Sequence, residues 1–167
     1  MTPIFACLVT CPGTPVLQGR TPNQLRDSHM PFVRTAVIKG TSQQQRQRIV
    51  DGIHQALIES IGMPPDELFN LVADYDPEQF FYSRTFNGVA RSDNLIVIEI
   101  TMRRGRSDAM KRELYKKIAD NLGAQAQVRP QDLFIFMHEN DYSDWSVGFG
   151  KFAMALVQQA GEDAAAV

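Results

Sequence analysis

The feature of the sequence that most restricts its fold is an internal repeat. The segment PPDELFNLVADY, residues 64–75, resembles RPQDLFIFMHEN, residues 129–140. The matched residues, each 65 positions apart, are Pro65 with Pro130, Glu67 with Asp132, and Leu68 and Phe69 with Leu133 and Phe134. A chain with such a repeat is expected to contain two copies of one supersecondary unit.

The first copy has the pattern strand, helix, strand. Residues 32–38 are β-branched and apolar, which predicts a strand. Ser42 followed by Gln45 predicts a capping box at the start of a helix, and Gly62 is placed to end that helix. Apolar residues recur at helical spacing between them, at Ile49, Ile53, Leu57 and Ile61. A second strand is predicted at 68–75.

The second copy repeats this pattern. Residues 95–102, LIVIEITM, predict a strand, and RRGRS at 103–107 predicts a turn that ends at Ser107 as a helix N-cap. The apolar stripe of the following helix consists of Met110, Leu114, Ile118 and Leu122. The last strand is expected within residues 129–140 because this segment matches the second strand of the first copy.

Two consecutive βαβ units predict an α/β (α+β) fold with one four-stranded sheet and both helices on one face. Strands inside each unit are expected to pair in parallel. A sheet covered on one side leaves its other face without a partner, which favours a homo-oligomer. The chain is predicted to consist of an N-terminal extension (1–29), a domain (31–153) and a tail (154–167). Within the domain we expect a first unit (31–76), a linker (77–94), a second unit (95–142) and a glycine-rich, aromatic interface segment (143–153).

Composition argues against several classes of function. The formal net charge of −2 does not fit a nucleic-acid-binding module, which carries a basic excess. No apolar run approaches the roughly 18 residues of a membrane span, and the first residues do not resemble a secretory signal, so a cytoplasmic protein is expected. Cys7 and Cys11 lack the spacing of a metal site, and the short segment 148–150 does not suit a nucleotide loop. We therefore expect no metal and no cofactor.

Met30 and Pro31 form a pair that looks like a translation start inside the chain. The pair directly precedes the first predicted strand, and Met30 would be removed from the small Pro31. Residues 1–29 contain four of the nine prolines and show no hydrophobic period. This segment is therefore interpreted as a disordered extension or as sequence upstream of the true start.

The order of several motifs resembles that of a known family. These motifs are MPFV at 30–33, GMPPDELF at 62–69, GVARSDNLIVIEIT at 88–101, RRGRS at 103–107 and DWSVGFG at 144–150. Together they resemble the tautomerase superfamily, and within it the group of malonate semialdehyde decarboxylase. The resemblance covers residues 30 to about 153. It implies paired βαβ units, a homotrimer, a catalytic amino-terminal proline and a small carboxylate as substrate.

Pro31 is the residue that this resemblance makes the catalytic base. A free α-amino group has a pKa of about 8, and nearby arginines with partial desolvation lower it towards neutrality. Such an amine can accept and return a proton at operating pH. The nitrogen of an internal proline belongs to an amide and is not basic. Pro31 is therefore expected to be catalytic only in a chain that starts there.

Three arginines are candidates for binding the substrate's carboxylate. Alternation along the strand places Arg103 on the less apolar face, and Arg106 lies one residue before the Ser107 cap, where anions are favoured. The related decarboxylase has two arginines separated by one residue, whereas two residues lie between Arg103 and Arg106. Arg104 therefore remains a rival for either role.

Glu67, Trp145 and Phe149 complete the candidate site. The decarboxylase has an aspartate after its paired prolines, and Glu67 aligns with it, with Asp66 beside it. The longer Glu67 side chain makes decarboxylase or hydratase chemistry less favoured than simple tautomerisation. Trp145 and Phe149 are candidates for the lining of the pocket or for the subunit interface.

The sequence leaves three functions open. The first is an isomerase that moves a proton between enol and keto forms of a small 2-oxo carboxylate, with Pro31 as base and acid. The second is a lyase like malonate semialdehyde decarboxylase. The third is a non-catalytic oligomeric binding module in which residues 1–29 block the proline nitrogen.

Overall fold

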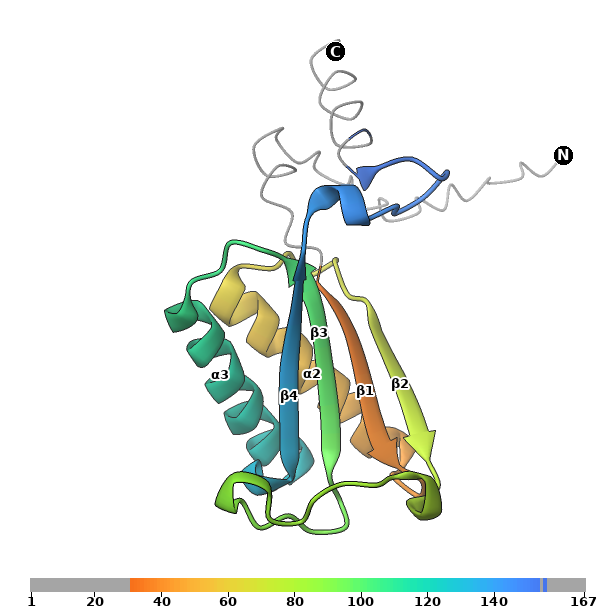
Figure 1. Ribbon diagram of the computed structural model, residues 1–167, viewed down its shortest axis with the longest axis vertical. Coiled ribbons are helices and arrows are strands. Elements are labelled where there is room, and N and C mark those ends of the chain that lie inside the picture. The colour runs from red at the N-terminus through yellow and green to blue at the C-terminus, as the bar shows by residue number, and fades with distance from the viewer. Residues whose placement is uncertain (1–30, 154, 156–167) are drawn as a thin grey trace, which may run out of the picture.

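The computed structural model describes residues 31–153 and residue 155 (Figure 1). The predicted extension at 1–29, Met30 and nearly all of the predicted tail at 154–167 lie outside the described residues. The main elements are β1 (Phe32–Ile38), α2 (Gln43–Ile61), β2 (Asn70–Tyr75), β3 (Ile96–Arg103), α3 (Asp108–Ala126) and β4 (Leu133–Asn140). Four short 3-10 turns also occur: η1 (Pro77–Gln79), η2 (Phe86–Gly88), η3 (Pro130–Asp132) and η4 (Tyr142–Asp144).

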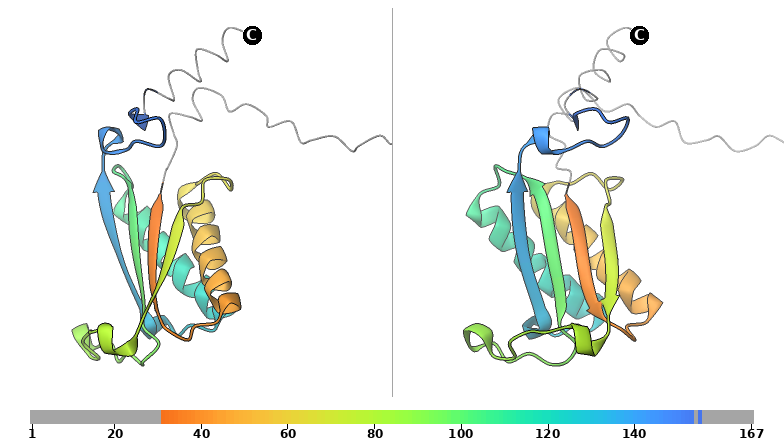
Figure 2. Two further views of the ribbon diagram at one scale, coloured as in Figure 1. Left: turned by 90° about the vertical axis from the view of Figure 1, so that its right-hand side faces the viewer. Right: turned by 45° about the vertical axis from the view of Figure 1, so that its right-hand side comes forward.

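The four strands form one mixed sheet in the order β2-β1-β3-β4. β1 pairs with β2 in parallel and β3 with β4 in parallel, so each repeat forms the expected βαβ unit. The two units meet where β1 pairs with β3 in the antiparallel direction. Both helices cover the same face of the sheet, and the other face is uncovered (Figure 2). The predicted fold class is confirmed.

The core lies between the two helices and one face of the sheet. The helices contribute the predicted stripes, in which Ile49, Ile53, Leu57, Leu114, Ile118 and Leu122 are fully buried. The sheet contributes alternate residues, since Ile98, Ile100 and Met102 of β3 are buried while the residues between them are partly exposed. Full burial of a side chain of this size contributes roughly 1.5–3 kcal/mol of hydrophobic free energy. This alternation confirms the face predicted for Arg103.

The helix ends follow the sequence signals with one exception. The hydroxyls of Ser42 and Ser107 accept hydrogen bonds from the third backbone N–H that follows, and Gly62 ends α2 with φ 71°. The predicted capping box is only half formed. The side chain of Gln45 donates instead to the carbonyl of Ala126 at 3.4 Å, because the C-terminus of α3 lies beside the N-terminus of α2 and offers a carbonyl that α3 itself does not use.

The bounds of two predicted strands differ from the structure. β2 begins at Asn70 rather than at residue 68, because the turn that carries Glu67 continues to Phe69 before the first pairing of Val33 with Asn70. β3 lies one residue later than the predicted 95–102, at Ile96–Arg103. The segment 77–94 between the units contains η1 and η2 but no strand.

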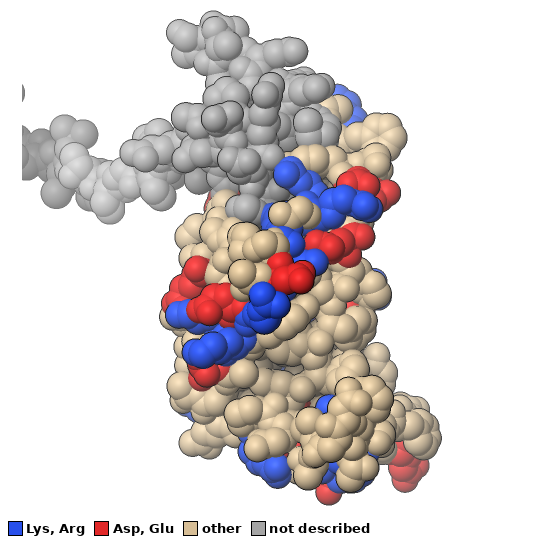
Figure 3. All heavy atoms as spheres, turned by 60° about the vertical axis from the view of Figure 1, so that its left-hand side comes forward, with Lys and Arg blue, Asp and Glu red and all other residues tan. Residues whose placement is uncertain are grey.

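The surface of the helical layer carries charges of both signs. On the face shown in Figure 3, basic and acidic side chains lie side by side. Ion pairs account for part of this pattern, including Lys117 with Glu59 at 2.9 Å and Lys116 with Asp120 at 2.7 Å. Such interleaving produces no extended field of one sign on this face. Within residues 31–153, neither helix has the length and apolar content needed to cross a membrane.

Candidate active site

Residues from all four strands come together where β1 and β2 start and β3 and β4 end. We call this end of the strands the Pro31 edge. Because β1 and β3 are antiparallel, the start of β1 lies beside the end of β3, and Phe32 pairs with Thr101. β2 is parallel to β1 and therefore starts at the same edge, while β4 ends there with Asn140 beside Arg103. This is the upper edge in Figure 1. Pro31 and Glu67, which precede β1 and β2, thus lie at the same edge as the arginines that end β3.

Pro31 is buried at this edge, directly before the first residue of β1. Its place opposite the end of β3 follows from the register, since the next residue pairs with Thr101. In a chain that retains residue 30, the nitrogen of Pro31 belongs to a planar amide whose lone pair is delocalised.

The three arginines of the β3–α3 turn lie in different surroundings. Arg104 forms an ion pair with Asp141 at 2.8 Å, and its side chain is 62% exposed. The guanidinium carbon of Arg103 lies over the ring of Tyr142, 4.4 Å from the ring centroid. Arg106 turns back and donates from Nη1 to the carbonyl of Arg103 at 2.8 Å. Arg104 is therefore directed towards a carboxylate, while Arg103 and Arg106 stay close to each other.

The turn between these arginines depends on Gly105. Its φ of 115° is a conformation that side chains rarely allow, so a glycine is required for the chain to reverse here. The reversal places Arg106 next to the first turn of α3, which Ser107 caps through Met110 N–H. The partial positive charge of the helix N-terminus adds to that of the guanidinium groups.

Electrostatics at Arg106 favour an incoming anion. Burial lowers the pKa of Arg106, and the nearby positive charge of Arg103 lowers it further, whereas Tyr142 and Glu139 oppose this effect. An arginine still remains cationic under such conditions. Two close cations that are partly removed from water are stabilised by an anion placed between them, and a carboxylate matches the planar guanidinium groups.

Glu67 lies in the turn that leads into β2. Its backbone N–H donates to the carbonyl of Pro64 at 3.1 Å, which closes the turn after Gly62. Its side chain is partly buried, while Asp66 is exposed. Of the two neighbouring carboxylates, Glu67 is thus the one held against the protein at this edge.

The two aromatic candidates differ in their surroundings. Trp145 is partly buried, and its Nε1–H donates to the side-chain oxygen of Asn140 at 2.7 Å. This bond ties the segment after η4 to the end of β4. Phe149 is 94% exposed within a single chain. The structure therefore brings Trp145 to the edge of the site and leaves Phe149 on the surface.

Tyr142 and Asn140 are residues at this edge that the sequence analysis missed. Asn140 pairs with Arg103 in the register of β3 and β4, and Tyr142 follows two residues later in η4. The parallel pairing of the second unit predicts that the ends of β3 and β4 meet. The orientation of η4 over Arg103, in contrast, has no local sequence signal.

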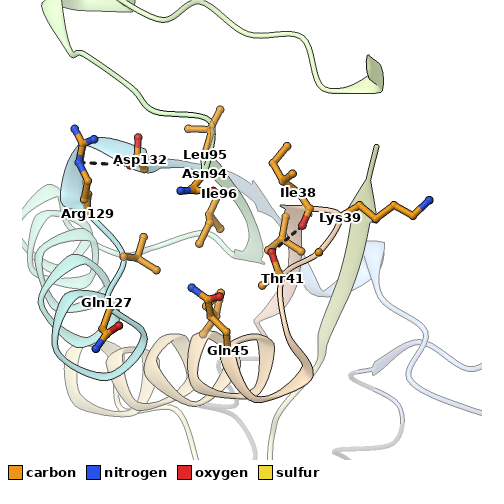
Figure 4. A pocket seen from close by; sticks show the side chains of 14 residues that line it. Ile38, Lys39, Thr41, Gln45, Asn94, Leu95, Ile96, Gln127, Arg129 and Asp132 are labelled. Atoms are coloured by element: carbon orange, nitrogen blue, oxygen red, sulfur yellow. Dashed lines mark hydrogen bonds and ion pairs between the residues drawn. The ribbon is translucent and has the colours of Figure 1, made fainter. Parts of the chain in front are cut away.

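A cavity of about 440 Å³ lies at the opposite edge of the sheet (Figure 4). This cavity is related to the candidate site by the internal repeat, because the matching residues of the two places are 65 positions apart in the sequence. Ile96 corresponds to Pro31, Ile38 to Arg103, and Thr41 to Arg106. No arginine stands at the positions that correspond to Arg103 and Arg106, and Arg129, which lines the cavity, is paired with Asp132 at 3.6 Å. The cation that corresponds to Arg104, Lys39, extends away from the cavity towards Asp76 at 2.8 Å. The Pro31 edge is therefore the better candidate for chemistry.

The matching carboxylates of the two repeats, Glu67 and Asp132, also differ in their surroundings. Asp132, the counterpart of Glu67, is almost fully buried and accepts hydrogen bonds from the backbone N–H and the hydroxyl of Ser92, at 2.6 and 2.7 Å. It therefore anchors the linker to the start of β4. Among the described residues there is no cluster of three or more histidine, cysteine or acidic side chains that could hold a metal.

Comparisons with known proteins agree with the fold and the repeat. Two family profiles, both described as tautomerase enzyme, match residues 67–148 and 31–83. A curated relative, probable tautomerase YusQ of Bacillus subtilis (strain 168), is 36% identical over 125 residues, which cover 75% of this chain and 98% of the relative.

Solved structures show the same similarity. FG41 malonate semialdehyde decarboxylase inhibited by 3-bromopropiolate is 29% identical and has a TM-score of 0.70, with 77% of this chain and 96% of that chain covered. A fused 4-OT symmetric trimer has a TM-score of 0.63 at 15% identity, with 75% of this chain and 98% of that chain covered. The second of these similarities concerns the fold alone.

Proposed function

The chain belongs to the tautomerase family of enzymes, and from this premise we propose that it moves a proton between the enol and keto forms of a small 2-oxo carboxylate. The amine of Pro31 is the base and the acid, and Arg103 and Arg106 bind the carboxylate. The observation that carries the proposal is the antiparallel pairing of β1 with β3, which brings the start of one strand to the end of the other.

The mechanism needs a free secondary amine and an anion site. The amine of Pro31 removes a proton next to the carbonyl, the electrons of the broken bond form an enolate, and the guanidinium groups stabilise its negative charge. The ammonium of Pro31 then returns the proton to the other atom of the enolate. Atoms and charge balance within the substrate, so the reaction consumes no co-reactant. Glu67 is not required for this step.

The first experiment tests the amine. Protein that starts at Met30 should lose this residue and expose the Pro31 nitrogen, which an intact mass will show. We expect this protein to ketonise phenylenolpyruvate, the enol form of a 2-oxo carboxylate. The same chain with residues 1–30 attached is a matched control, because it keeps every described residue but has an amide at Pro31.

Substitution of the base gives the second control. Pro31→Ala in the protein that starts at Met30 keeps an amino group but replaces the secondary amine by a primary one, and a loss of turnover on the order of 10²-fold or more is expected for a general base. Unchanged turnover in Pro31→Ala, or full turnover in the chain that retains residues 1–30, would exclude Pro31 as the base.

A decarboxylase is the second candidate function, because the similarity to FG41 malonate semialdehyde decarboxylase spans nearly all of that chain. In this reaction a cationic Pro31 polarises the 3-oxo group, and Glu67 assists the loss of carbon dioxide. Release of carbon dioxide from malonate semialdehyde, abolished by Glu67→Gln, supports this alternative. Inactivity of the protein that starts at Met30 towards both substrates would favour a binding module without catalysis.

We also propose that the chain forms a homotrimer. The fused 4-OT structures of this fold are described as trimers. The uncovered face of the sheet carries exposed apolar side chains, with Leu71 at 58% and Phe134 at 38% exposure. Apolar residues on this face would be buried by a second copy of the chain.

A further inference from the structure

We propose that Tyr142 is a positioning residue for the anion site, and that its ring holds the guanidinium of Arg103 in place beside Arg106. This inference rests on the proposed function of the site. The ring of Tyr142 contacts the guanidinium of Arg103, so Tyr142 acts through this arginine. Its role would be to orient the substrate's carboxylate, and it would thereby select for substrates that carry one.

The contact between the ring and the cation supports this role. The distance of 4.4 Å from the guanidinium carbon of Arg103 to the ring centroid of Tyr142 is well within the roughly 6 Å limit of a cation–π interaction. An aromatic ring attracts a cation through its quadrupole and leaves the full positive charge in place. Asp141, in contrast, neutralises Arg104 from 2.8 Å. The ring therefore orients the guanidinium of Arg103 without itself placing a negative charge beside it.

The ring is itself held by a rigid turn. In η4, Asp141 and Asp144 form a reciprocal capping box, in which the Asp141 N–H donates to Asp144 Oδ2 at 2.7 Å. Trp145 closes the turn through its N–H to the carbonyl of Tyr142 at 3.2 Å. The side chain of Trp145 is anchored on Asn140, the residue that pairs with Arg103. Tyr142 is therefore fixed relative to the end of β3.

The position of Arg103 matters because Arg106 is close. Arg106 donates to the backbone carbonyl of Arg103, and burial and then the positive charge of Arg103 lower the pKa of Arg106, so the two cations act on each other within one small turn. The positive charges of Arg103 and Arg106 repel each other. An arginine side chain that is no longer held by a contact also gains on the order of 2 kcal/mol of rotamer entropy. Without the ring, Arg103 is expected to spend less time beside Arg106, and a carboxylate would find only one of the two cations in place.

The test compares two substitutions at Tyr142 in the protein form that shows turnover. Tyr142→Phe keeps the ring and removes the hydroxyl, so KM for phenylenolpyruvate should stay within about 3-fold of the wild type. Tyr142→Leu removes the quadrupole, and KM should rise about 5- to 30-fold, the range of a cation–π contact, with a smaller change in kcat. If Tyr142→Leu does not fold, Tyr142→Met offers a flexible apolar side chain without a ring.

Two controls separate positioning from a general structural effect. In an Arg103→Gln background, Tyr142→Leu should have no further effect on KM, because its effect passes through Arg103. The methyl ester of phenylenolpyruvate, which lacks the charge, should react equally well with the wild type and with Tyr142→Leu. A persistent effect of Tyr142→Leu in either control would overturn the proposal, as would equal losses in the Phe and Leu variants or no loss in either.

A binding measurement keeps this inference separate from the proposed function. If the wild type shows no turnover in any form, the proposed reaction fails, but calorimetric binding of phenylpyruvate to the full chain still tests the anion site. Affinity retained in Tyr142→Phe and weakened in Tyr142→Leu supports the role of the ring. Equal affinity of both variants and the wild type, or no binding by any of them, would overturn it.

Discussion

At the scale of the residue, the three arginines of one turn differ because of their neighbours rather than their type. Arg104 is exposed and compensated by Asp141, whereas Arg106 is partly removed from water and lies near another cation. The sequence places all three within four positions and leaves them equivalent. The contacts of each guanidinium are the basis on which Arg103 and Arg106 are proposed as the pair that binds a carboxylate.

This difference leads to a prediction for turnover of phenylenolpyruvate. Arg104→Gln is expected to change kcat/KM by less than about 3-fold, because exposed ion pairs contribute little. Arg103→Gln and Arg106→Gln should each lower it by about 10- to 100-fold, the magnitude of a lost hydrogen bond to a charged group. Steady-state kinetics of the three variants will check this, and a large loss in Arg104→Gln alone would reassign the anion site.

At the scale of the element, the two helices approach each other closely at Gly52. A Cβ atom built on Gly52 would lie 2.8 Å from a terminal methyl group of Leu122, which is fully buried. The side chain of Asn121 also donates to the carbonyl of Gly52 across the helix pair, at 3.1 Å. The absence of a side chain at Gly52 therefore sets the distance between α2 and α3 at this point.

Glycine-to-alanine substitutions in the two helices test this account. Alanine normally stabilises a helix interior by about 1 kcal/mol relative to glycine. Gly123→Ala in α3 should show this gain, because its Cβ would meet only the carbonyl of Val128 at 3.7 Å. Gly52→Ala should gain nothing or lose stability, since Leu122 must move within a packed core. Urea unfolding of both variants checks the difference, and equal gains would contradict the close approach.

At the scale of the whole molecule, the sheet has one covered and one uncovered face. Residues of β2 illustrate the division, because Val72 packs against the core while Leu71 is exposed on the other side. A free apolar face on an isolated chain is unfavourable in water, and association of copies removes it from solvent.

Charge introduced on the uncovered face is expected to break the proposed trimer. Leu71→Asp should dissociate it to the monomer, because a buried carboxylate without a partner costs several kcal/mol. Ala124→Asp, on the exposed outer surface of α3, is the matched control and should leave the assembly intact. Light scattering after size exclusion measures both, and a Leu71→Asp protein that keeps its mass would show that this face is not the interface.

The elements and their order follow from signals that can be read along the sequence. Helix caps at Ser42, Gly62 and Ser107, the apolar stripes and the repeat are signals in which nearby residues specify their own backbone, and the structure confirms them. The boundaries of β2 and the second half of the predicted capping box could not be predicted from the sequence. The start of β2 depends on where β1 lies, since pairing begins at Val33 with Asn70. The side chain of Gln45 donates to a carbonyl of α3 that only the packing of the two helices brings beside it.

The residues of the candidate site come together through pairing between distant strands. Parallel pairing inside each unit was predictable, but the antiparallel pairing of β1 with β3, which brings Pro31 to the end that carries Arg103, joins residues about 70 positions apart. The placement of Tyr142 over Arg103 likewise depends on the turn that follows β4. Hydrophobic periods and caps are local and can be read along the chain, whereas these contacts arise from how whole strands and turns pack against each other.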